Sequence, residues 1–331
     1  MTQGVLVTAG ERLAVDCAIS WVGELIEEAA DGGLTAEDPG TGTVRIRVEA
    51  TRAPFETAGW RPLARGVVGH DRSLLLRNPL STGFDLRVDV EDGSPRFTFR
   101  WRPPRRERAM SLALRSRFHL LARALLLRYP ALWWAGTRGR APLHASACTA
   151  GDLGVALLAG PGGVGKSTLV SKELAAGGRA ICDNVCVADG ASAWGVVEPL
   201  RVEGGGGGRR MPHGRRETAM TGRVPVLAPD RIVVLERGSD ATATVRPCDQ
   251  GAAARSLVTG TYMAQELRRY WAFAATLAAG TGVGPPHPPV AEAAAAFAGR
   301  LPATLITLPS QPGPGLRELL ARVDQEAGTW T

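Results

Sequence analysis

Lysine is almost missing from the chain, although the chain is basic. Of its 39 Lys and Arg residues only Lys166 and Lys172 are lysine, and the formal net charge is +7. Aromatic residues make up only 5% of the chain, and they do not alternate with arginine along a helical stripe. Surfaces that bind nucleic acid gather basic residues on one face. The arginines of this chain are scattered instead, which indicates a general preference for arginine over lysine in its composition. We do not expect nucleic acid to be a partner.

Long apolar runs and paired cysteine motifs are also missing. No stretch of about 18 apolar residues is present to span a membrane, and the first residues, MTQGVLVTAGERLAVD, have no pattern of a secretion signal. We therefore expect a cytoplasmic protein with no membrane partner. The five cysteines lack C-x2-C spacing, so we expect reduced thiols and assign no metal to them: Cys17, Cys148, Cys182, Cys186 and Cys248.

What the chain does have is a globular composition and a change of pattern near its middle. Its 331 residues are 44% hydrophobic and 21% charged, enough for two domains. Residues 1–137 predict a β-rich (α+β) accessory domain with a connecting helix over Arg108–Leu127, which Pro130 would end. The clearest alternating strands of this domain are Thr43–Glu49, Phe84–Val90 and Arg96–Trp101.

Residues 138–331 have the pattern of an α/β catalytic domain. An apolar strand, Gly154–Ala159, precedes a glycine-rich turn, a helix over Ser167–Ala176 and a short strand, Arg179–Cys182. This order predicts a three-layer α/β core. The later elements expected are a strand at Arg231–Leu235, a helix around Met263–Leu277, a Gly/Pro linker through Pro289, a short helix from Ala291, a strand at Ala303–Leu308 and a final helix near Gly315–Glu326.

The glycine-rich turn, GPGGVGKS, matches the G-x-x-x-x-G-K-[ST] phosphate loop in the strand-to-helix context that this motif requires. With lysine this rare, about 0.003 such matches are expected by chance. Glycine lets backbone N–H groups surround phosphate oxygens, Lys166 would reach the β- and γ-phosphates, and the Ser167 hydroxyl would bind Mg²⁺. We expect ATP and Mg²⁺ as ligands. The predicted nucleotide-binding residues are Gly160, Pro161, Gly162, Gly163, Val164, Gly165, Lys166, Ser167 and Thr168.

Chemistry on a triphosphate needs a carboxylate that holds Mg²⁺ or accepts the proton of the attacking hydroxyl. Asp183 is the best candidate for both roles, because it ends the short strand that follows the phosphate-loop helix and that we expect next to Gly154–Ala159. The alternative reading of Asp183 is a turn-forming residue. Glu236, at the end of the strand Arg231–Leu235, is the rival acid and would suit an ordinary ATPase.

These residues resemble the catalytic domain of HPr kinase/phosphorylase and of related kinases that modify precursor peptides in natural-product pathways. The match runs over LHASA (143–147), GVALLAG, GPGGVGKST and AICDNV, and more weakly through RVPVLAPDRIVVLERG to about residue 310. The resemblance implies a fold of the HPr kinase and phosphoenolpyruvate carboxykinase type. It also implies that Asp183 is the base or metal contact and that His144 lies near the phosphates. Where many family members have two adjacent aspartates, this chain has Cys182-Asp183.

The segment Glu203–Arg216, EGGGGGRRMPHGRR, is glycine-rich and basic. It reads either as a plain surface loop or as a mobile lid that closes one arginine on an acidic ligand. The arginines available for that role are Arg209, Arg210, Arg215 and Arg216. Glu198, just upstream, is a further candidate for a metal or substrate contact.

The leading functional hypothesis is an ATP-dependent kinase with Lys166, Asp183 and His144 as its catalytic residues. The resemblance implies the serine of a peptide or protein as the acceptor hydroxyl. A small-molecule kinase of a biosynthetic pathway and a phosphate-loop ATPase or nucleotide switch are the alternatives. A homo-oligomer is compatible with the sequence, which does not specify the oligomeric state.

Overall fold

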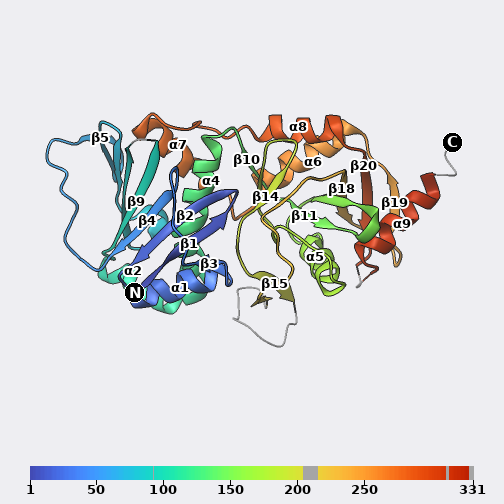
Figure 1. Cartoon of the computed structure of the whole chain (residues 1–331), viewed down its shortest axis with the longest axis horizontal. Coiled ribbons are helices and arrows are strands. Elements are labelled where there is room, and N and C mark those ends of the chain that lie inside the picture. Colours follow the sequence, from blue (N-terminus) through green and yellow to red (C-terminus); the bar gives the residue numbers. More distant parts are fainter. Residues whose placement is uncertain (92, 204–214, 311–312, 328–331) are drawn as a thin grey trace. The chain divides into compact units, whose positions relative to one another are not determined.

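The computed structural model describes residues 1–91, 93–203, 215–310 and 313–327, and it has a mixed α/β fold. The chain forms two compact units (Figure 1). Unit 1 contains Met1–Arg138 and Arg269–His287, and unit 2 contains the described residues of 139–268 and 288–327. Arg269–His287, which the sequence analysis assigned to the second domain, thus groups with the first. Within the described part of the chain, every helix is too short or too polar to span a lipid bilayer.

Unit 1 is built on a nine-stranded sheet with the order β3-β1-β2-β4-β9-β8-β7-β6-β5. Most neighbouring strands are antiparallel, but β4 is parallel to both β2 and β9. Alternating apolar residues such as Val44, Ile46 and Val48 are buried, as the period of a half-buried strand requires. The strands are β1 Thr2–Thr8, β2 Glu11–Cys17, β3 Leu34–Thr35, β4 Val44–Glu49, β5 Arg61–Ala64, β6 Val67–His70, β7 Ser73–Leu76, β8 Phe84–Glu91 and β9 Ser94–Trp101.

The helices of unit 1 differ from the single predicted helix. Leu114 (φ −113°, ψ 46°) separates α2 from α3, and a π-helical turn then leads into the next helix. Pro130 lies in the first turn of that helix and does not end it, because a proline at this position needs no intrahelical N–H bond. The bounds are α1 Ser20–Ala30, η1 Pro79–Ser81, α2 Arg105–Ala113, α3 Arg115–Arg123, η2 Ala124–Arg128, α4 Tyr129–Gly136 and α7 Tyr270–Thr281.

Helix α7 is apolar and packs within unit 1, which explains why Arg269–His287 belongs there. The ring of Tyr129 lies 5.5 Å from that of Tyr270 and 5.4 Å from that of Phe273. A Cβ on Gly280 would lie 2.3 Å from a Leu74 side-chain carbon, so the helix approaches β7 closely. The helix predicted around Met263–Leu277 is confirmed only from Tyr270 onward, because Met263 ends α6 and Tyr270 begins α7.

Unit 2 has a five-stranded sheet with the order β11-β12-β18-β20-β19. Its three central strands are parallel, and the two outer strands run antiparallel to their neighbours. These strands are β11 Ser146–Thr149, β12 Val155–Ala159, β18 Arg231–Arg237, β19 Thr244–Pro247 and β20 Ala303–Leu308. The apolar runs predicted for β12, β18 and β20 are confirmed as strands, and they are buried as parallel strands usually are.

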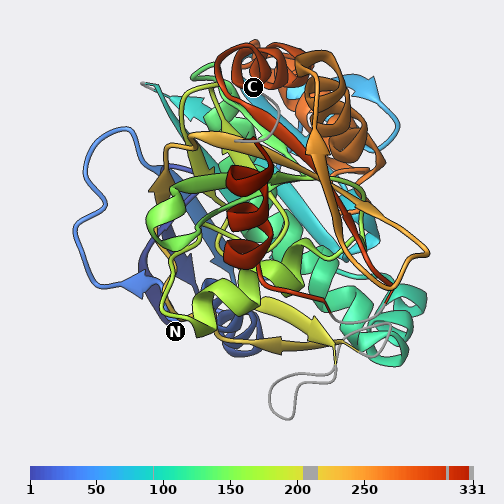
Figure 2. The ribbon, with the colours of Figure 1, turned by 90° about the vertical axis from the view of Figure 1, so that its right-hand side faces the viewer.

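Helices cover both faces of this sheet (Figure 2). Leu158, Val233 and Ile306 face one side and pack with Val170 and Leu319 of α5 and α9, whereas α6 contacts β12 and β18 and also packs on α8. The three-layer core expected from the sequence is therefore present. The helices are η3 Gly151–Leu153, α5 Lys166–Ala175, α6 Gln250–Met263, α8 Val290–Arg300 and α9 Leu316–Ala327.

Two smaller sheets complete unit 2. One has the order β10-β13-β14-β17 and the other pairs β15 with β16. Arg215 and Arg216, two arginines of the predicted lid, lie in β16 opposite Glu203 and Val202. Residues 204–214, with Arg209 and Arg210, lie outside the described residues. The bounds are β10 Ala141–Leu143, β13 Cys186–Ala188, β14 Ala193–Gly195, β15 Leu200–Glu203, β16 Arg215–Thr218 and β17 Val226–Leu227.

Candidate functional site

The glycine-rich loop joins the end of β12 to the start of α5 within unit 2. Three of its glycines have positive φ angles: 143° at Gly160, 80° at Gly163 and 122° at Gly165. Residues with a side chain rarely adopt these angles, and a Cβ on Gly160 would lie only 2.6 Å from the Leu235 carbonyl oxygen. By contrast, a Cβ on Gly162 or Gly163 would meet no atom within 4 Å. The loop is therefore fixed on its sheet side and open on the other.

Lys166, the first residue of α5, folds back onto this loop. Its side chain is buried, and Nζ donates hydrogen bonds to the carbonyl oxygens of Gly160 at 2.8 Å and Pro161 at 3.1 Å. Burial lowers the pKa of Lys166 to about 8, while the negative charges of Asp183 and Glu266 act in the opposite direction. The ammonium group is thus held at the loop together with two carboxylates.

Asp183 lies next to Lys166 and Ser167. The segment that leads to it, however, does not lie beside β12, as the sequence predicted. The segment before it is not a regular strand and pairs with β11, not with β12, through hydrogen bonds from Ile181 N to Ala147 O and from Thr149 N to Arg179 O. The prediction that this segment neighbours β12 is therefore wrong. The cause is that β11, the strand before β12, takes the position at the sheet edge.

The Asp183 carboxylate is fully buried. Its Oδ2 accepts hydrogen bonds of 3.3 Å from Arg201 N and from Asn184 Nδ2, whereas Oδ1 has no partner among the described residues. Burial raises the pKa of Asp183, while the Ser167 side chain and the Arg201 guanidinium oppose that shift. A buried carboxylate oxygen without a partner is costly, which makes Asp183 a candidate for binding a ligand or a proton.

His144 follows β10 and is also buried close to Lys166. Its backbone N donates a 3.0 Å hydrogen bond to Thr261 Oγ1 on α6, while its Nδ1 has no partner among the described residues. Burial, and then the positive charge of Lys166, lower the pKa of His144 to about 4. The imidazole is therefore neutral at physiological pH, and the structure brings together three residues singled out in the sequence: Lys166, Asp183 and His144.

A buried ion-pair group adjoins these residues, and sequence reasoning found only part of it. Arg201 Nη2 lies 2.6 Å from Glu198 Oε2, and Arg201 Nη1 lies 3.1 Å from Glu266 Oε1. Burial alone would lower the pKa of Arg201, but the carboxylates of Glu198 and Glu266 raise it. Glu198 was a weak candidate, whereas Arg201 and Glu266 carried no signal, because arginine is common throughout the chain and the pairing spans 65 residues.

Glu236, the rival acid, lies near the end of β18 with an exposed side chain. Its charge acts on the Cys248 thiol, and it is not among the groups that shift the pKa of Lys166. Among the described residues, no group of three or more His, Cys, Asp or Glu could hold a metal ion. A metal at this site would therefore depend on Ser167 and Asp183 together with oxygens from a ligand.

No protein-family model matches the chain, and no curated protein matches it either. The functional assignment therefore depends on the residues and on their geometry.

Proposed function

We propose that this protein is an ATP-dependent kinase of the HPr kinase-like type, which transfers the γ-phosphoryl group to a hydroxyl with the help of Mg²⁺. The observation that carries the proposal is the position of Asp183, a buried acid with one unpartnered oxygen next to Lys166 and Ser167. In a phosphate-loop site, this is where chemistry on the γ-phosphate requires a carboxylate.

The residues fit a magnesium ion. Mg²⁺ favours oxygen ligands and keeps several waters, so one hydroxyl and one carboxylate are enough from the protein when phosphate oxygens supply the rest. Ser167 and Asp183 are the residues that would hold it, and Oδ1 of Asp183 is the atom that lacks a partner. When bound, Mg²⁺ would neutralise charge on the phosphates.

The protein's own groups have distinct roles in this proposal. Lys166 exchanges its hydrogen bonds to Gly160 and Pro161 for bonds to phosphate oxygens, and the N–H groups of the loop and of the first turn of α5 add further donors. Asp183 either orients the acceptor hydroxyl or takes its proton, and the atom available for this role is the same Oδ1 that would otherwise bind Mg²⁺, because Oδ2 already accepts two hydrogen bonds. A pKa raised by burial makes Asp183 a stronger base than an exposed aspartate.

His144 and Arg201 act through these groups. A neutral imidazole near Lys166 can donate or accept one hydrogen bond without adding positive charge. The backbone N–H of Arg201 fixes Oδ2 of Asp183, while its guanidinium is held by Glu198 and Glu266. We infer that Arg201 is a positioning residue and that the acceptor is a serine of a peptide or protein in the cytoplasm. This acceptor follows from the resemblance to peptide-modifying kinases.

The deciding experiment is single-turnover transfer from γ-labelled ATP to a panel of serine-containing peptides and hydroxyl-bearing metabolites. Acceptor phosphorylation and release of free phosphate are scored separately. Asp183→Asn is expected to keep nucleotide affinity within a few-fold and to lose about 10²- to 10⁴-fold in transfer, the range for a missing general base or metal-orienting carboxylate.

Glu236→Gln is the matched control, since it removes one carboxylate charge at the end of the neighbouring strand. We expect it to be nearly silent. If Glu236→Gln is the damaging change and phosphate is released without transfer to any acceptor, the chain is an ATPase or nucleotide switch and the kinase proposal is wrong.

A further inference from the structure

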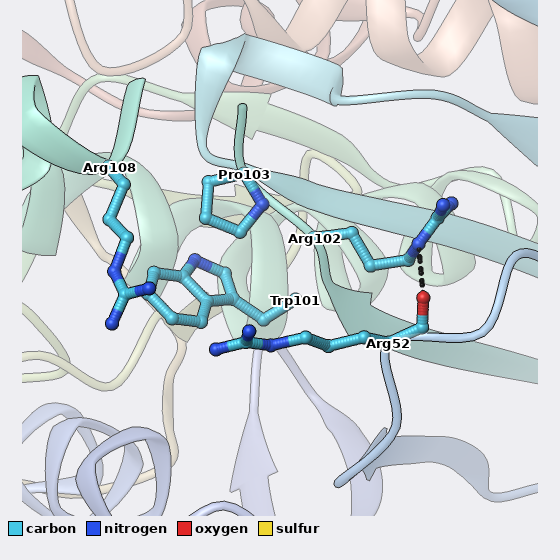
Figure 3. Close-up of a pocket in the computed structure, with 5 residues that line it drawn as sticks. All are labelled: Arg52, Trp101, Arg102, Pro103 and Arg108. Carbon is cyan, nitrogen blue, oxygen red and sulfur yellow. Dashed lines mark hydrogen bonds between the residues drawn. The ribbon is translucent and has the colours of Figure 1, made fainter. Parts of the chain in front are cut away.

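A basic pocket of about 220 Å³ lies in unit 1, and none of the residues of the candidate site lines it. It forms where β9 ends and α2 begins, and the chain after β4 supplies one more residue. Its lining residues are Arg52, Trp101, Arg102, Pro103 and Arg108 (Figure 3). Three guanidinium groups around one indole make a site that suits an anion.

One of these arginines builds the pocket, and two remain available to a ligand. Arg102 Nε donates a 2.8 Å hydrogen bond to the Arg52 carbonyl oxygen, and Arg102 Nη1 pairs with Asp85 at 2.7 Å. The side chains of Arg52 and Arg108 have no hydrogen bond or ion pair with another described residue. Figure 3 shows both extending toward the Trp101 ring, and the Arg108 guanidinium carbon lies 5.9 Å from the ring centroid.

The two acids near this pocket, Asp85 and Glu107, pair with neither Arg52 nor Arg108 among the described residues. Asp85 is engaged by Arg102, and both carboxylate oxygens of Glu107 accept hydrogen bonds from Asn78 Nδ2, at 2.7 and 2.6 Å. Arg52 and Arg108 therefore present positive charge beside an aromatic face. An aromatic surface lowers the local dielectric constant, which strengthens a guanidinium–carboxylate contact compared with one in bulk water.

An exposed apolar surface lies next to the pocket on α2. Leu112 is 75% exposed and Met110 is 50% exposed. Helical spacing places Arg105, Arg108 and Leu112 on one face of α2, with Leu112 one turn beyond the pocket. That turn spans about 6 Å, which is the length of two residues of extended peptide. A peptide with an acidic and an apolar side chain two residues apart contacts both the arginines and Leu112.

We propose that this pocket and the Leu112 face of α2 dock an acidic peptide segment of the form acidic-x-apolar. Its carboxylate binds between Arg52 and Arg108 against Trp101, and its apolar side chain packs on Leu112. This docking site belongs to unit 1 alone, so it stands whether the phosphate-loop site transfers phosphate or only hydrolyses a nucleotide.

The proposal is tested with a fluorescently labelled peptide of repeated Glu-Gly-Leu-Gly. The full-length protein is titrated into the peptide, and fluorescence anisotropy measures binding. We expect saturable binding that the double variant Arg52→Ala/Arg108→Ala weakens at least tenfold and that Leu112→Ser weakens about threefold or more. Arg65→Ala/Arg72→Ala is the matched control. It removes the same charge from exposed positions of unit 1, so it should change binding less than twofold.

Two further probes separate specific docking from general attraction of charge. Glu-Gly-Ser-Gly repeats, which keep the charge and lack the apolar side chain, should bind at least threefold more weakly. Absence of saturable peptide binding would overturn the proposal, and so would equal losses in both double variants. A single-stranded oligonucleotide of equal charge is tested in the same assay. If it binds more tightly than the peptide, and if Arg52→Ala/Arg108→Ala loses that binding, the pocket is assigned to nucleic acid instead. Circular dichroism melts of each variant confirm that it is folded.

Discussion

Burial shifts the pKa values of the two basic side chains nearest the loop in the same direction. Lys166 falls to about 8 and His144 to about 4, and in both cases loss of solvent is the largest cause. The two residues nevertheless differ at neutral pH, because Lys166 stays protonated and His144 stays neutral. The site therefore combines one fixed positive charge with one uncharged imidazole, and each residue should leave its own signature in a pH profile.

Nucleotide affinity is expected to fall as the pH rises through about 8, because Lys166 loses its proton there and a neutral amine attracts phosphate weakly. Above that pH the dissociation constant of an ATP analogue should rise by up to about tenfold per pH unit. Isothermal titration between pH 7 and pH 10 measures it. Lys172→Ala, in the same helix, should keep this slope, and Lys166→Ala should bind more weakly and lose the slope. A slope retained in Lys166→Ala would assign the titration to another group.

His144 should make the protein sensitive to acid. Its pKa is lower in the folded chain than the ordinary value of 6.5, so the unfolded state binds more protons between about pH 6.5 and pH 4. The stability that a neutral His144 provides is complete above pH 6.5 and is lost as the pH falls toward 4. This loss amounts to roughly 2 kcal/mol between pH 7 and pH 5.

The free energy of unfolding at the two pH values, from urea titration, tests this expectation. His144→Gln should remove most of the difference between pH 7 and pH 5, because glutamine cannot take up the proton. His70→Gln, which makes the same substitution at an exposed histidine of unit 1, is the control variant. An acid sensitivity that survives in His144→Gln would contradict the role given to this histidine.

At the scale of elements, the strand, loop and helix around residue 160 depend on backbone conformations that only glycine adopts easily. Gly160 combines a φ of 143° with a close approach to the carbonyl of Leu235 on β18, and a Cβ on Gly260 of α6 would lie 3.1 Å from the Gly160 carbonyl oxygen. The loop is therefore held between a strand and a helix before any ligand binds.

Gly160→Ala is expected to lower the free energy of unfolding by about 1–3 kcal/mol, which is the cost of a strained backbone conformation. The close contact of its Cβ with the Leu235 carbonyl oxygen would lower it further. Gly162→Ala is the matched control, because its Cβ would meet no atom within 4 Å and its φ is not positive. Chemical denaturation of both variants gives the comparison. Equal stability of the two would mean that the loop is not held as tightly as its contacts indicate.

The elements that sequence predicted well are those whose signal is local. The alternation in β4, β8 and β9, the apolar runs of β12, β18 and β20, and the periodicity of α5 and α9 are all confirmed, because burial of each depends on its own residues. The errors arise where tertiary packing, and not the local sequence pattern, determines the bounds or the neighbours of an element. A π-helical turn interrupts the helix before Pro130, and β11 separates the segment of Asp183 from β12.

The residues of the candidate site can be divided in the same way, into those with a local sequence signal and those without one. Sequence reasoning found Lys166, Ser167, Asp183 and His144, because motif and order along the chain mark them. It could not find the Arg201–Glu266 ion pair, since no local pattern joins residues that far apart. It favoured Asp183 over Glu236, and the structure adds that Asp183 is buried whereas Glu236 is exposed.

At the scale of the whole molecule, unit 1 is built from two separate stretches of the chain. Residues 269–287 supply α7, whose Tyr270 and Phe273 pack on Tyr129 and whose Gly280 lies against Leu74. Without this helix, the apolar side chains that it contacts would face water. Unit 1 thus ends its first stretch at Arg138, next to the boundary at residue 137 that the sequence suggested, but it also includes Arg269–His287.

A fragment of residues 1–138 is expected to lack a cooperative thermal transition, whereas the same fragment joined to residues 269–287 by a flexible linker should unfold in one step. Differential scanning calorimetry distinguishes the two. Phe273→Ala in the linked protein should cost about 3–5 kcal/mol, as truncation of a buried phenylalanine usually does. A stable, cooperative 1–138 fragment would show that α7 is dispensable.

The shortage of lysine gives the buried Lys166 a practical value. Amine-acylating reagents react with the neutral amine, and this chain offers them only two lysine side chains. The Lys172 Nζ donates to the Gly313 carbonyl, whereas Lys166 has its pKa lowered to about 8 and lies at the glycine-rich loop. Mass spectrometry of the acylated, purified protein would therefore need to separate the Lys166 peptide only from the peptides of Lys172 and of the exposed N-terminal amine. The extent of labelling at the Lys166 peptide would report occupancy of the loop.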